Sequence, residues 1–144
     1  MRLWHHELLH LLPNSQLIAQ WRECNLLIKD YNEDKKTNHI LINYVWDYPI
    51  EHLYSYMDLV KNELYSRGFK VVSDRRLIRF FENVDTVFDG KHNKNYLLQC
   101  FMNLQEKFEN GQKDFKHETY INLYNFVNKK LNGILNLIER EVNM

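Results

Sequence analysis

The side chains that could carry chemistry gather near the start of the sequence. Glu23 follows Arg22 in the segment QLIAQWRE, and a carboxylate beside a guanidinium can move protons and balance charge on a reacting group. Gln16 and Gln20 precede this pair by one or two helical turns, on similar sides of a helix. Adjacent residues do not face each other on a helix, so Arg22 and Glu23 are not a simple surface ion pair. From the pattern alone, two solvated side chains are the plainer interpretation.

A run of basic residues forms a second candidate site. It contains Arg67, Lys70, Arg75, Arg76 and Arg79, and Asp74 is the acidic residue within it. Such a run can follow a phosphate backbone, because each neutralised phosphate releases counterions. It can equally be the solvated face of a helix, and the sequence leaves both interpretations open.

Aromatic residues and histidines in the first half offer two further kinds of site. Trp4 and Trp21 could stack on an extruded base; we expect Trp21 in the core and leave Trp4 open between core and pocket wall. His5, His6 and His10 have offsets that suggest metal binding, but no cysteine partner or H-E-x-x-H spacing accompanies them. We therefore predict surface or interfacial histidines, no metal site and no cofactor.

The elements that position these residues are predicted to be helices. Apolar residues recur at steps of three and four, and Asn14 or Ser15 is available to cap the first helix. Residues 39–48 are ambiguous between a short strand and a buried connector. The predicted helices cover residues 14–31, 49–68, 77–81, 96–108, 120–131 and 134–142.

Composition sets the fold class. The 144 residues include four glycines and two prolines, too few for an all-β fold with its frequent turns. We predict a mainly α protein, a single compact domain over residues 1–144 with about five to six helices. Nineteen basic residues balance nineteen acidic ones, so DNA binding would need a local patch. Short apolar runs predict no membrane association, and Cys24 and Cys100 read as buried, reduced thiols of a cytoplasmic protein.

Two segments in this order resemble the pyrimidine-dimer DNA glycosylase (phage endonuclease V-like) family. The opening MRLWHHELLHLLPNSQLIAQWREC is similar to the family's start, with its helix of the type Q-L-x-A-x-aromatic-R-E at residues 16–23. NELYSRGFKV, residues 62–71, resembles the segment that ends a later helix in the family. The resemblance covers about the first half of the chain, so residues 1–88 are interpreted as the glycosylase-like part and residues 89–144 as a helical extension of unknown role.

The resemblance implies a DNA-repair enzyme that acts on damaged pyrimidines. Family members use the N-terminal α-amine as the nucleophile, form an imine with the sugar and cut the backbone by β-elimination. Here the bulky residue after Met1 should prevent removal of that methionine, so Met1 would carry the amine and Glu23 would act as acid and base. Gln16 stands where the phage-type sequence has histidine. The predicted DNA-binding residues are Arg2, Trp4, Gln16, Arg22, Arg67, Lys70, Arg75 and Arg76, with damaged DNA as the partner.

An alternative from another functional class stays open. The chain would then be a helical interaction protein that keeps the glycosylase fold without catalysis. The second half, with its phenylalanine- and tyrosine-rich helices, is expected either to cover the core or to form a homodimer surface.

Overall fold

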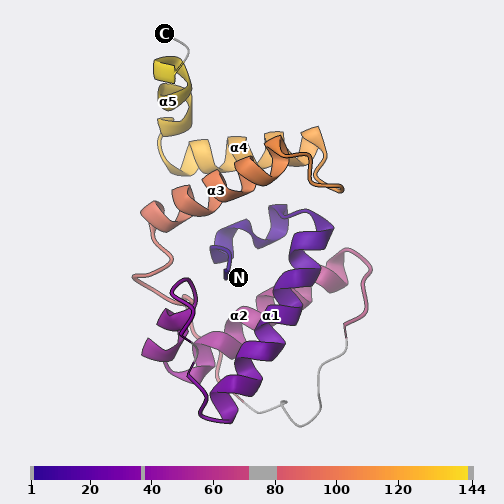
Figure 1. The fold of residues 1–144 in the computed structure, drawn as a ribbon, viewed down its shortest axis with the longest axis vertical. Helices are drawn as coiled ribbons and strands as arrows, with labels where there is room; N and C mark the ends of the chain where they lie inside the picture. The colour runs from indigo at the N-terminus through magenta and orange to yellow at the C-terminus, as the bar shows by residue number, and fades with distance from the viewer. Residues whose placement is uncertain (1, 37, 72–80, 143–144) are drawn as a thin grey trace.

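The computed structural model describes residues 2–36, 38–71 and 81–142. In this part of the chain every regular element is a helix, as expected of a mainly α protein (Figure 1). The elements are η1 (His6–Leu11), α1 (Asn14–Asn32), η2 (Asn43–Asp47), α2 (Ile50–Ser66), α3 (Lys94–Glu109), α4 (His117–Lys130) and α5 (Ile134–Val142).

The helices form two layers with the N-terminal segment between them. α1 packs on α2 in one layer and α3 packs on α4 in the other. The short 3-10 helix η1 contacts both α2 and α4, so it bridges the layers, and α5 projects from the end of α4 (Figure 1). The start of the chain is therefore an internal element, covered by helices from both halves of the sequence.

The predicted helices agree closely with the observed ones. The apolar spacing placed α1 to α5 correctly, and residues 39–48 form a connector with a 3-10 turn, η2, in place of a strand. η1 was not predicted. The helix predicted at residues 77–81 falls almost entirely outside the described residues, and Phe81, which is described, is not helical.

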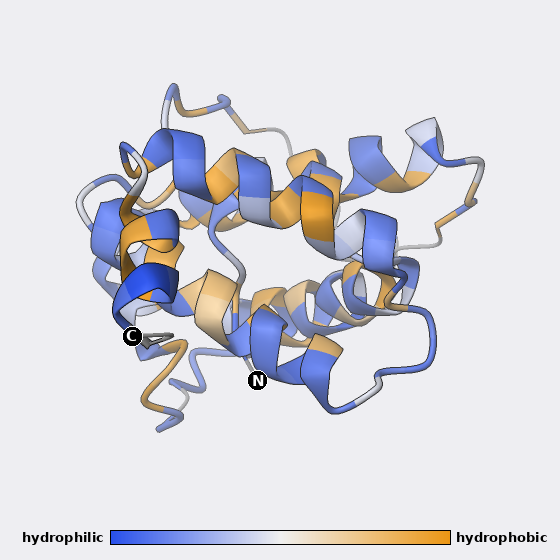
Figure 2. Ribbon diagram, turned by 90° about the horizontal axis from the view of Figure 1, so that it is seen from above, coloured by the Kyte–Doolittle hydropathy of each residue, from blue (hydrophilic) through white to orange (hydrophobic). Residues whose placement is uncertain are grey.

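Apolar residues from both layers share one core. Figure 2 shows apolar and polar residues alternating around the helices, as amphipathic helices require. Tyr56, Phe88 and Phe101 are among the largest fully buried side chains. Cys24 and Cys100 are free and buried, which confirms the prediction of buried thiols. No described helix combines the length and the apolar character needed to cross a membrane.

The start of α1 is capped from a distant part of the chain. The helix begins after Pro13, and neither Asn14 nor Ser15 caps it with its own side chain, so the predicted local cap was wrong. Instead the Asp114 carboxylate, from the loop between α3 and α4, accepts hydrogen bonds from the Ser15 amide at 2.7 Å and the Ser15 hydroxyl at 2.6 Å. A carboxylate at a helix N-terminus also meets the positive end of the helix dipole. This contact joins the layer of α3 and α4 to the layer of α1 and α2.

We expect Asp114→Ala to lower the free energy of unfolding by about 1 kcal/mol, the usual cost of losing an N-terminal cap. Burial opposes ionisation of Asp114, but hydrogen bonds from Ser15, Gln112 and its own backbone together outweigh it and lower the pKa. The lowered pKa means that the stabilisation is present at neutral pH and disappears as the pH falls through that pKa. Urea denaturation at pH 7 and at low pH measures both effects, and Asp85→Ala, at an exposed aspartate, is the control. Equal stability of the two variants at pH 7 would contradict the capping role.

Candidate active site

Gln20 organises the N-terminal segment. This side chain is only 1 % exposed and lies on the face of α1 that meets residues 2–4. Its Oε1 accepts the Trp4 amide at 2.7 Å and the Tyr56 hydroxyl at 2.9 Å. Its Nε2 donates to the Arg2 carbonyl at 3.0 Å and to Glu23 Oε2 at 3.1 Å. All four hydrogen-bonding positions of the amide are therefore occupied.

The pairing with residues 2 and 4 resembles that between two β-strands. In an extended chain, the carbonyl of one residue and the amide of the residue two positions later point to the same side. The Gln20 amide satisfies both of these groups, on Arg2 and Trp4, as a neighbouring strand would. On the same segment the Tyr56 hydroxyl also lies 2.6 Å from the Trp4 carbonyl, so it shares its one hydrogen between that carbonyl and Gln20 Oε1, and the Leu3 carbonyl accepts the Tyr96 hydroxyl. The segment is thus held by α1, α2 and α3 together.

Glu23 is held beside this segment by the same amide. It lies one turn after Gln20 on α1 and is half-buried. Burial raises its pKa, while hydrogen bonds from the Arg2 backbone and from Gln20 act in the opposite direction. A carboxyl whose pKa is raised takes up a proton more readily than an exposed one, and that readiness suits a general acid and base.

A cavity of about 210 Å³ lies in front of Glu23. Four of the residues predicted from sequence reach it: Arg2, Trp4, Gln16 and Glu23. The Arg2 guanidinium also lies over the Tyr96 ring, 5.7 Å from its centre. The remaining lining residues are Ala19, Gln20, Leu41, Asn103 and Lys107. The tertiary structure therefore gathers the opening residues, α1 and α3 around one carboxylate.

Other predicted residues lie elsewhere. Arg22 is exposed on α1 and does not line the cavity, and Lys70 is exposed after the end of α2. Trp21 is 9 % exposed and belongs to the core, as predicted. Met1, Arg75 and Arg76 are outside the described residues, as is Arg79.

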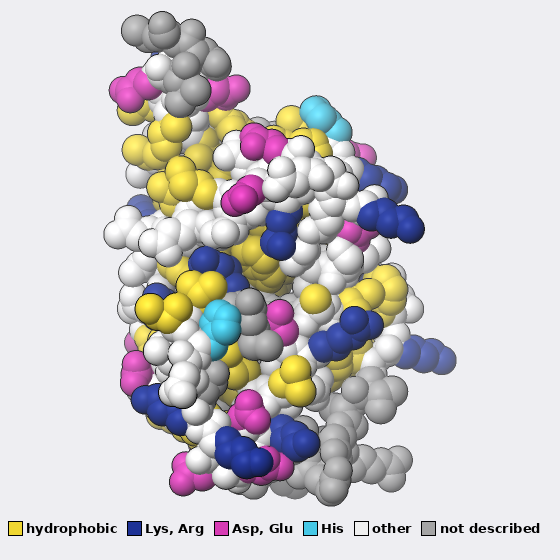
Figure 3. All heavy atoms as spheres, in the orientation of Figure 1, with side chains coloured by type: hydrophobic (Ala, Val, Ile, Leu, Met, Phe, Trp, Pro, Cys, Tyr) yellow, Lys and Arg dark blue, Asp and Glu magenta, His cyan; other side chains and the backbone are white. Residues whose placement is uncertain are grey.

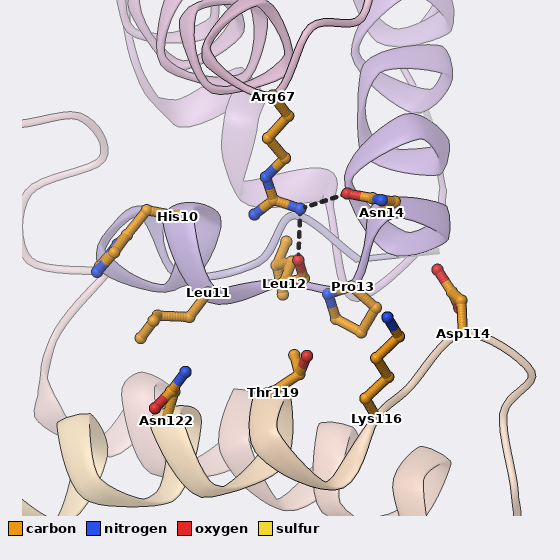
Figure 4. Close-up of a pocket in the computed structure, with 10 residues that line it drawn as sticks. All are labelled: His10, Leu11, Leu12, Pro13, Asn14, Arg67, Asp114, Lys116, Thr119 and Asn122. Atoms are coloured by element: carbon orange, nitrogen blue, oxygen red, sulfur yellow. Dashed lines mark hydrogen bonds between the residues drawn. The ribbon is translucent and has the colours of Figure 1, made fainter.

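Arg67 takes part in a different contact. Its guanidinium donates to the Leu12 carbonyl at 2.7 Å and to Asn14 Oδ1 at 2.9 Å (Figure 4). It also pairs with Glu63 at 2.9 Å. These groups lie at the turn between η1 and α1, beside a second cavity of about 270 Å³ that shares no lining residue with the first. Arg67 therefore fastens the C-terminal end of α2 to that turn, away from Glu23.

One face of the described residues carries charges of both signs. On this face, shown in Figure 3, Lys and Arg side chains are interspersed with Asp and Glu, in keeping with the balanced composition. The cations that line the Glu23 cavity, Arg2 and Lys107, are therefore considered individually.

The histidines cap η1. His5 and His92 are buried, which corrects the prediction of a surface or interfacial His5, whereas His10 is exposed. The Nδ1 atom of His5 accepts the Glu7 amide at 3.1 Å, and that of His92 accepts the His6 amide at 3.2 Å. Burial lowers the pKa of His5 to about 4 and that of His92 to about 2. Both rings are therefore neutral near pH 7 and can accept hydrogen bonds from amides at the start of η1 that have no partner within the helix.

These histidines also explain the cluster of potential metal ligands in this region. One nitrogen each of His5, His6 and His92 lies within 4.8 Å of the others. However, the Nδ1 atoms of His5 and His92 are already acceptors for backbone amides, and the second nitrogen of His92 contacts the Tyr44 hydroxyl at 2.8 Å. Amide hydrogens directed at the same nitrogens disfavour a cation between them, so a cap describes this cluster better than a metal centre.

The residues that sequence reasoning missed come mainly from α3. Asn103 and Lys107 enter the cavity from a helix whose chemistry was not read from the sequence. A signal was present, because Tyr96, Cys100, Asn103 and Lys107 follow one another at steps of four, three and four. This spacing places all four on one face of the helix, with Tyr96 and Cys100 followed by the polar Asn103 and Lys107. The central role of Gln20 could have been suspected from its three-residue spacing to Glu23.

The chain was also compared with known proteins. A family model described as pyrimidine dimer DNA glycosylase matches residues 1–77, more than half of the 144 residues. No match was found among curated proteins or among solved structures. The matched stretch includes every lining residue of this cavity except Asn103 and Lys107, and it ends before α3.

We expect Gln20→Ala to destabilise the protein and to release the N-terminal segment. The substitution leaves the buried Trp4 amide and the Arg2 carbonyl without their partner, which should lower the free energy of unfolding by about 2–4 kcal/mol. Gln16→Ala is the matched control, because Gln16 lines the same cavity from the same helix but has one hydrogen bond, to Gln112 at 2.7 Å. Denaturation curves compare the two, and amide hydrogen exchange at Trp4 reports on the segment. A loss no greater in Gln20→Ala than in Gln16→Ala would refute this role.

Proposed function

Because the chain belongs to the pyrimidine dimer DNA glycosylase family, we propose that it excises damaged pyrimidines and then cuts the abasic site through an imine on its N-terminal amine. In this proposal the amine of Met1 is the nucleophile, and Glu23 handles protons and stabilises the cationic intermediate. Arg2 contacts DNA at the cavity and Arg22 contacts it from the exposed side of α1. The observation that supports the proposal most directly is the convergence of Arg2, Trp4, Gln16 and Glu23 on one cavity.

The position of Arg2 supports Met1 as the nucleophile that the family resemblance implies. Met1 lies outside the described residues, but Arg2 follows it directly, and adjacent Cα atoms are about 3.8 Å apart. Because the Arg2 backbone shares hydrogen bonds with Gln20 and Glu23, an amine on Met1 would stay within reach of the Glu23 carboxylate. An α-amine suits this role, since its ordinary pKa of about 7.7–8.0 leaves part of it neutral near pH 7, unlike a lysine.

The covalent steps of the proposal balance as follows. The amine lone pair forms a bond to the sugar C1′, the bond from C1′ to the base nitrogen breaks, and the base leaves with a proton. The new C1′–N bond becomes a cationic imine as the sugar ring opens, with the ring oxygen taking a proton. Glu23 then removes a proton from C2′, and the electron pair expels the 3′ phosphate by β-elimination. Water hydrolyses the imine and restores the amine.

The environment of Glu23 suits both of its proposed roles, proton transfer and stabilisation of the cationic imine. Its raised pKa, caused chiefly by burial, makes it a better base towards a C–H proton than an exposed carboxylate would be. In its ionised form it would lie next to the positive charge of the imine, where a partly buried site strengthens the attraction. Trp4 also lines the cavity, but at 5 % exposure it belongs to the core and offers little surface on which an unstacked nucleotide could rest.

We expect Glu23→Gln to lower the rate of strand cleavage at an abasic site by about 10²–10⁴-fold, the usual contribution of a general acid or base. Glutamine keeps an oxygen that can accept from Gln20, so the fold should be retained. Single-turnover cleavage of an abasic duplex measures the rate, and circular dichroism checks the fold. Glu118→Gln, at an exposed glutamate on α4, is the control. Unchanged cleavage by a folded Glu23→Gln variant would refute the role of Glu23.

We expect borohydride to trap a covalent complex between the untagged protein and an abasic-site duplex, with the DNA attached to the N-terminal peptide. Acetylating the N-terminal amine, or placing extra residues before Met1, should abolish the complex, because an amide nitrogen has no free lone pair for attack. Peptide mapping by mass spectrometry locates the attachment and verifies the free N-terminus. A thymine-dimer duplex in a parallel reaction tests the lesion. An adduct mapped to a lysine would contradict the N-terminal mechanism, and no adduct from a free N-terminus would leave the non-catalytic alternative.

A further inference from the structure

α3 presents a row of side chains to the Glu23 cavity. Asn103 and Lys107 both line it, and they follow Tyr96 by seven and eleven residues. At about 100° per residue these three positions lie within about 40° of one another around the helix. Tyr96 contacts the opening residues, with its hydroxyl on the Leu3 carbonyl and its ring beneath the Arg2 guanidinium. One face of α3 therefore runs along the cavity.

Contacts on either side of this face hold α3 in place. At its N-terminal end Tyr96 is fastened to residues 2 and 3. Beyond its C-terminal end, Gln112 pairs with Gln16 at 2.7 Å and Asp114 caps α1. Asn103 and Lys107 lie between these two attachments, so the position of the helix beside Glu23 is set by the packing of the two layers and not by a mobile loop.

The two polar side chains are available to a ligand. Asn103 donates one amide hydrogen to the Gln99 carbonyl of its own helix at 2.9 Å, which leaves its other hydrogen and its Oδ1. Lys107 is exposed at the mouth of the cavity, and in the described part of the chain it takes part in no salt bridge. Although burial raises the pKa of Glu23, the positive charge of Lys107 is among the influences that lower it, so the ammonium acts electrostatically on the carboxylate.

We infer that α3 forms the backbone-recognition wall of the site, where Lys107 binds a phosphate flanking the nucleotide in the cavity and Asn103 hydrogen-bonds to that nucleotide. This inference rests on the proposed function and assigns its DNA contacts beyond the family match, which ends at residue 77. A lysine is a compact charge on a flexible stem, suited to a phosphate at the rim. A neutral amide at the wall is suited to the polar atoms of a sugar or a base edge.

In this inference the second half of the chain supplies DNA contacts to the site through α3. The basic run at residues 67–79 was the DNA-binding candidate from sequence, yet Arg67 is engaged at the turn before α1. Arg2 and Lys107, from different halves of the sequence, both line the cavity. Two cations at one cavity can engage phosphates of an unstacked nucleotide even though the protein has no net charge.

Binding of the intact protein to fluorescent DNA tests this inference without requiring cleavage. One duplex carries a tetrahydrofuran abasic analogue and a second is undamaged, and anisotropy is followed over a range of salt concentrations. We expect Lys107→Ala to weaken binding about tenfold and to reduce the slope of log affinity against log salt by about one, as loss of one phosphate contact should. Lys107→Arg should restore both. We expect Asn103→Ala to reduce the preference for the analogue duplex and to leave the salt slope unchanged.

Lys94→Ala is the matched control, because Lys94 is an exposed lysine on the same helix, about 140° around it from Lys107. Equal affinities and salt slopes for Lys107→Ala and Lys94→Ala would overturn the assignment of Lys107. Likewise, an undiminished preference in Asn103→Ala would overturn that of Asn103. The proposed function fails separately, if the wild-type protein binds the analogue duplex but gives no borohydride adduct with a true abasic site. A wild-type protein that binds neither duplex would overturn both.

Discussion

The buried amide of Gln20 is the constraint on which the site depends. An extended N-terminal segment exposes carbonyl and amide groups that must find partners once helices cover it. Gln20 satisfies two of them, and it also forms hydrogen bonds with the Tyr56 hydroxyl and the Glu23 carboxylate. Any movement of this side chain would break several buried hydrogen bonds at once and leave their groups unpaired, which costs free energy. The amide is therefore held in one geometry. Gln20 is therefore the side chain that links the opening residues directly to the Glu23 carboxylate.

The remaining structure supports this arrangement from both sides. The hydroxyls of Tyr56 and Tyr96 bind the carbonyls of Trp4 and Leu3. Neutral histidines satisfy the amides at the start of η1, which continues the segment between the two layers. A chain terminus is ordinarily poorly ordered unless it is tied down, and here the first residues described are held by α1, α2 and α3. The first described residues, from Arg2 onwards, are therefore fixed beside Glu23.

The two halves of the chain depend on each other. Asp114 caps α1, Gln112 pairs with Gln16, and His92 accepts the His6 amide. Residues beyond the family match thus complete elements within it. Arg67, which the sequence presented as a basic residue for DNA, instead satisfies the Leu12 carbonyl at the turn between η1 and α1. A guanidinium has several N–H donors and can bind either a phosphate or a backbone carbonyl. The groups around it decide which one it binds.

The sequence by itself determined the helices, because the apolar spacing that defines them is local and strong. It also determined the family, since the order of two short segments carried the resemblance. The structure places Glu23 and Arg2 at one cavity, while their part in catalysis stays a prediction. Tertiary structure alone decided what caps α1 and which side chains meet across the layers. Asp114 and Ser15 are separated by 99 residues, as the hydrogen bond between them records, and no local pattern predicts such a pair. For the same reason Lys107 and Asn103 could not be assigned from sequence: their partners across the cavity are brought near only by the packing of α3 against the N-terminal segment.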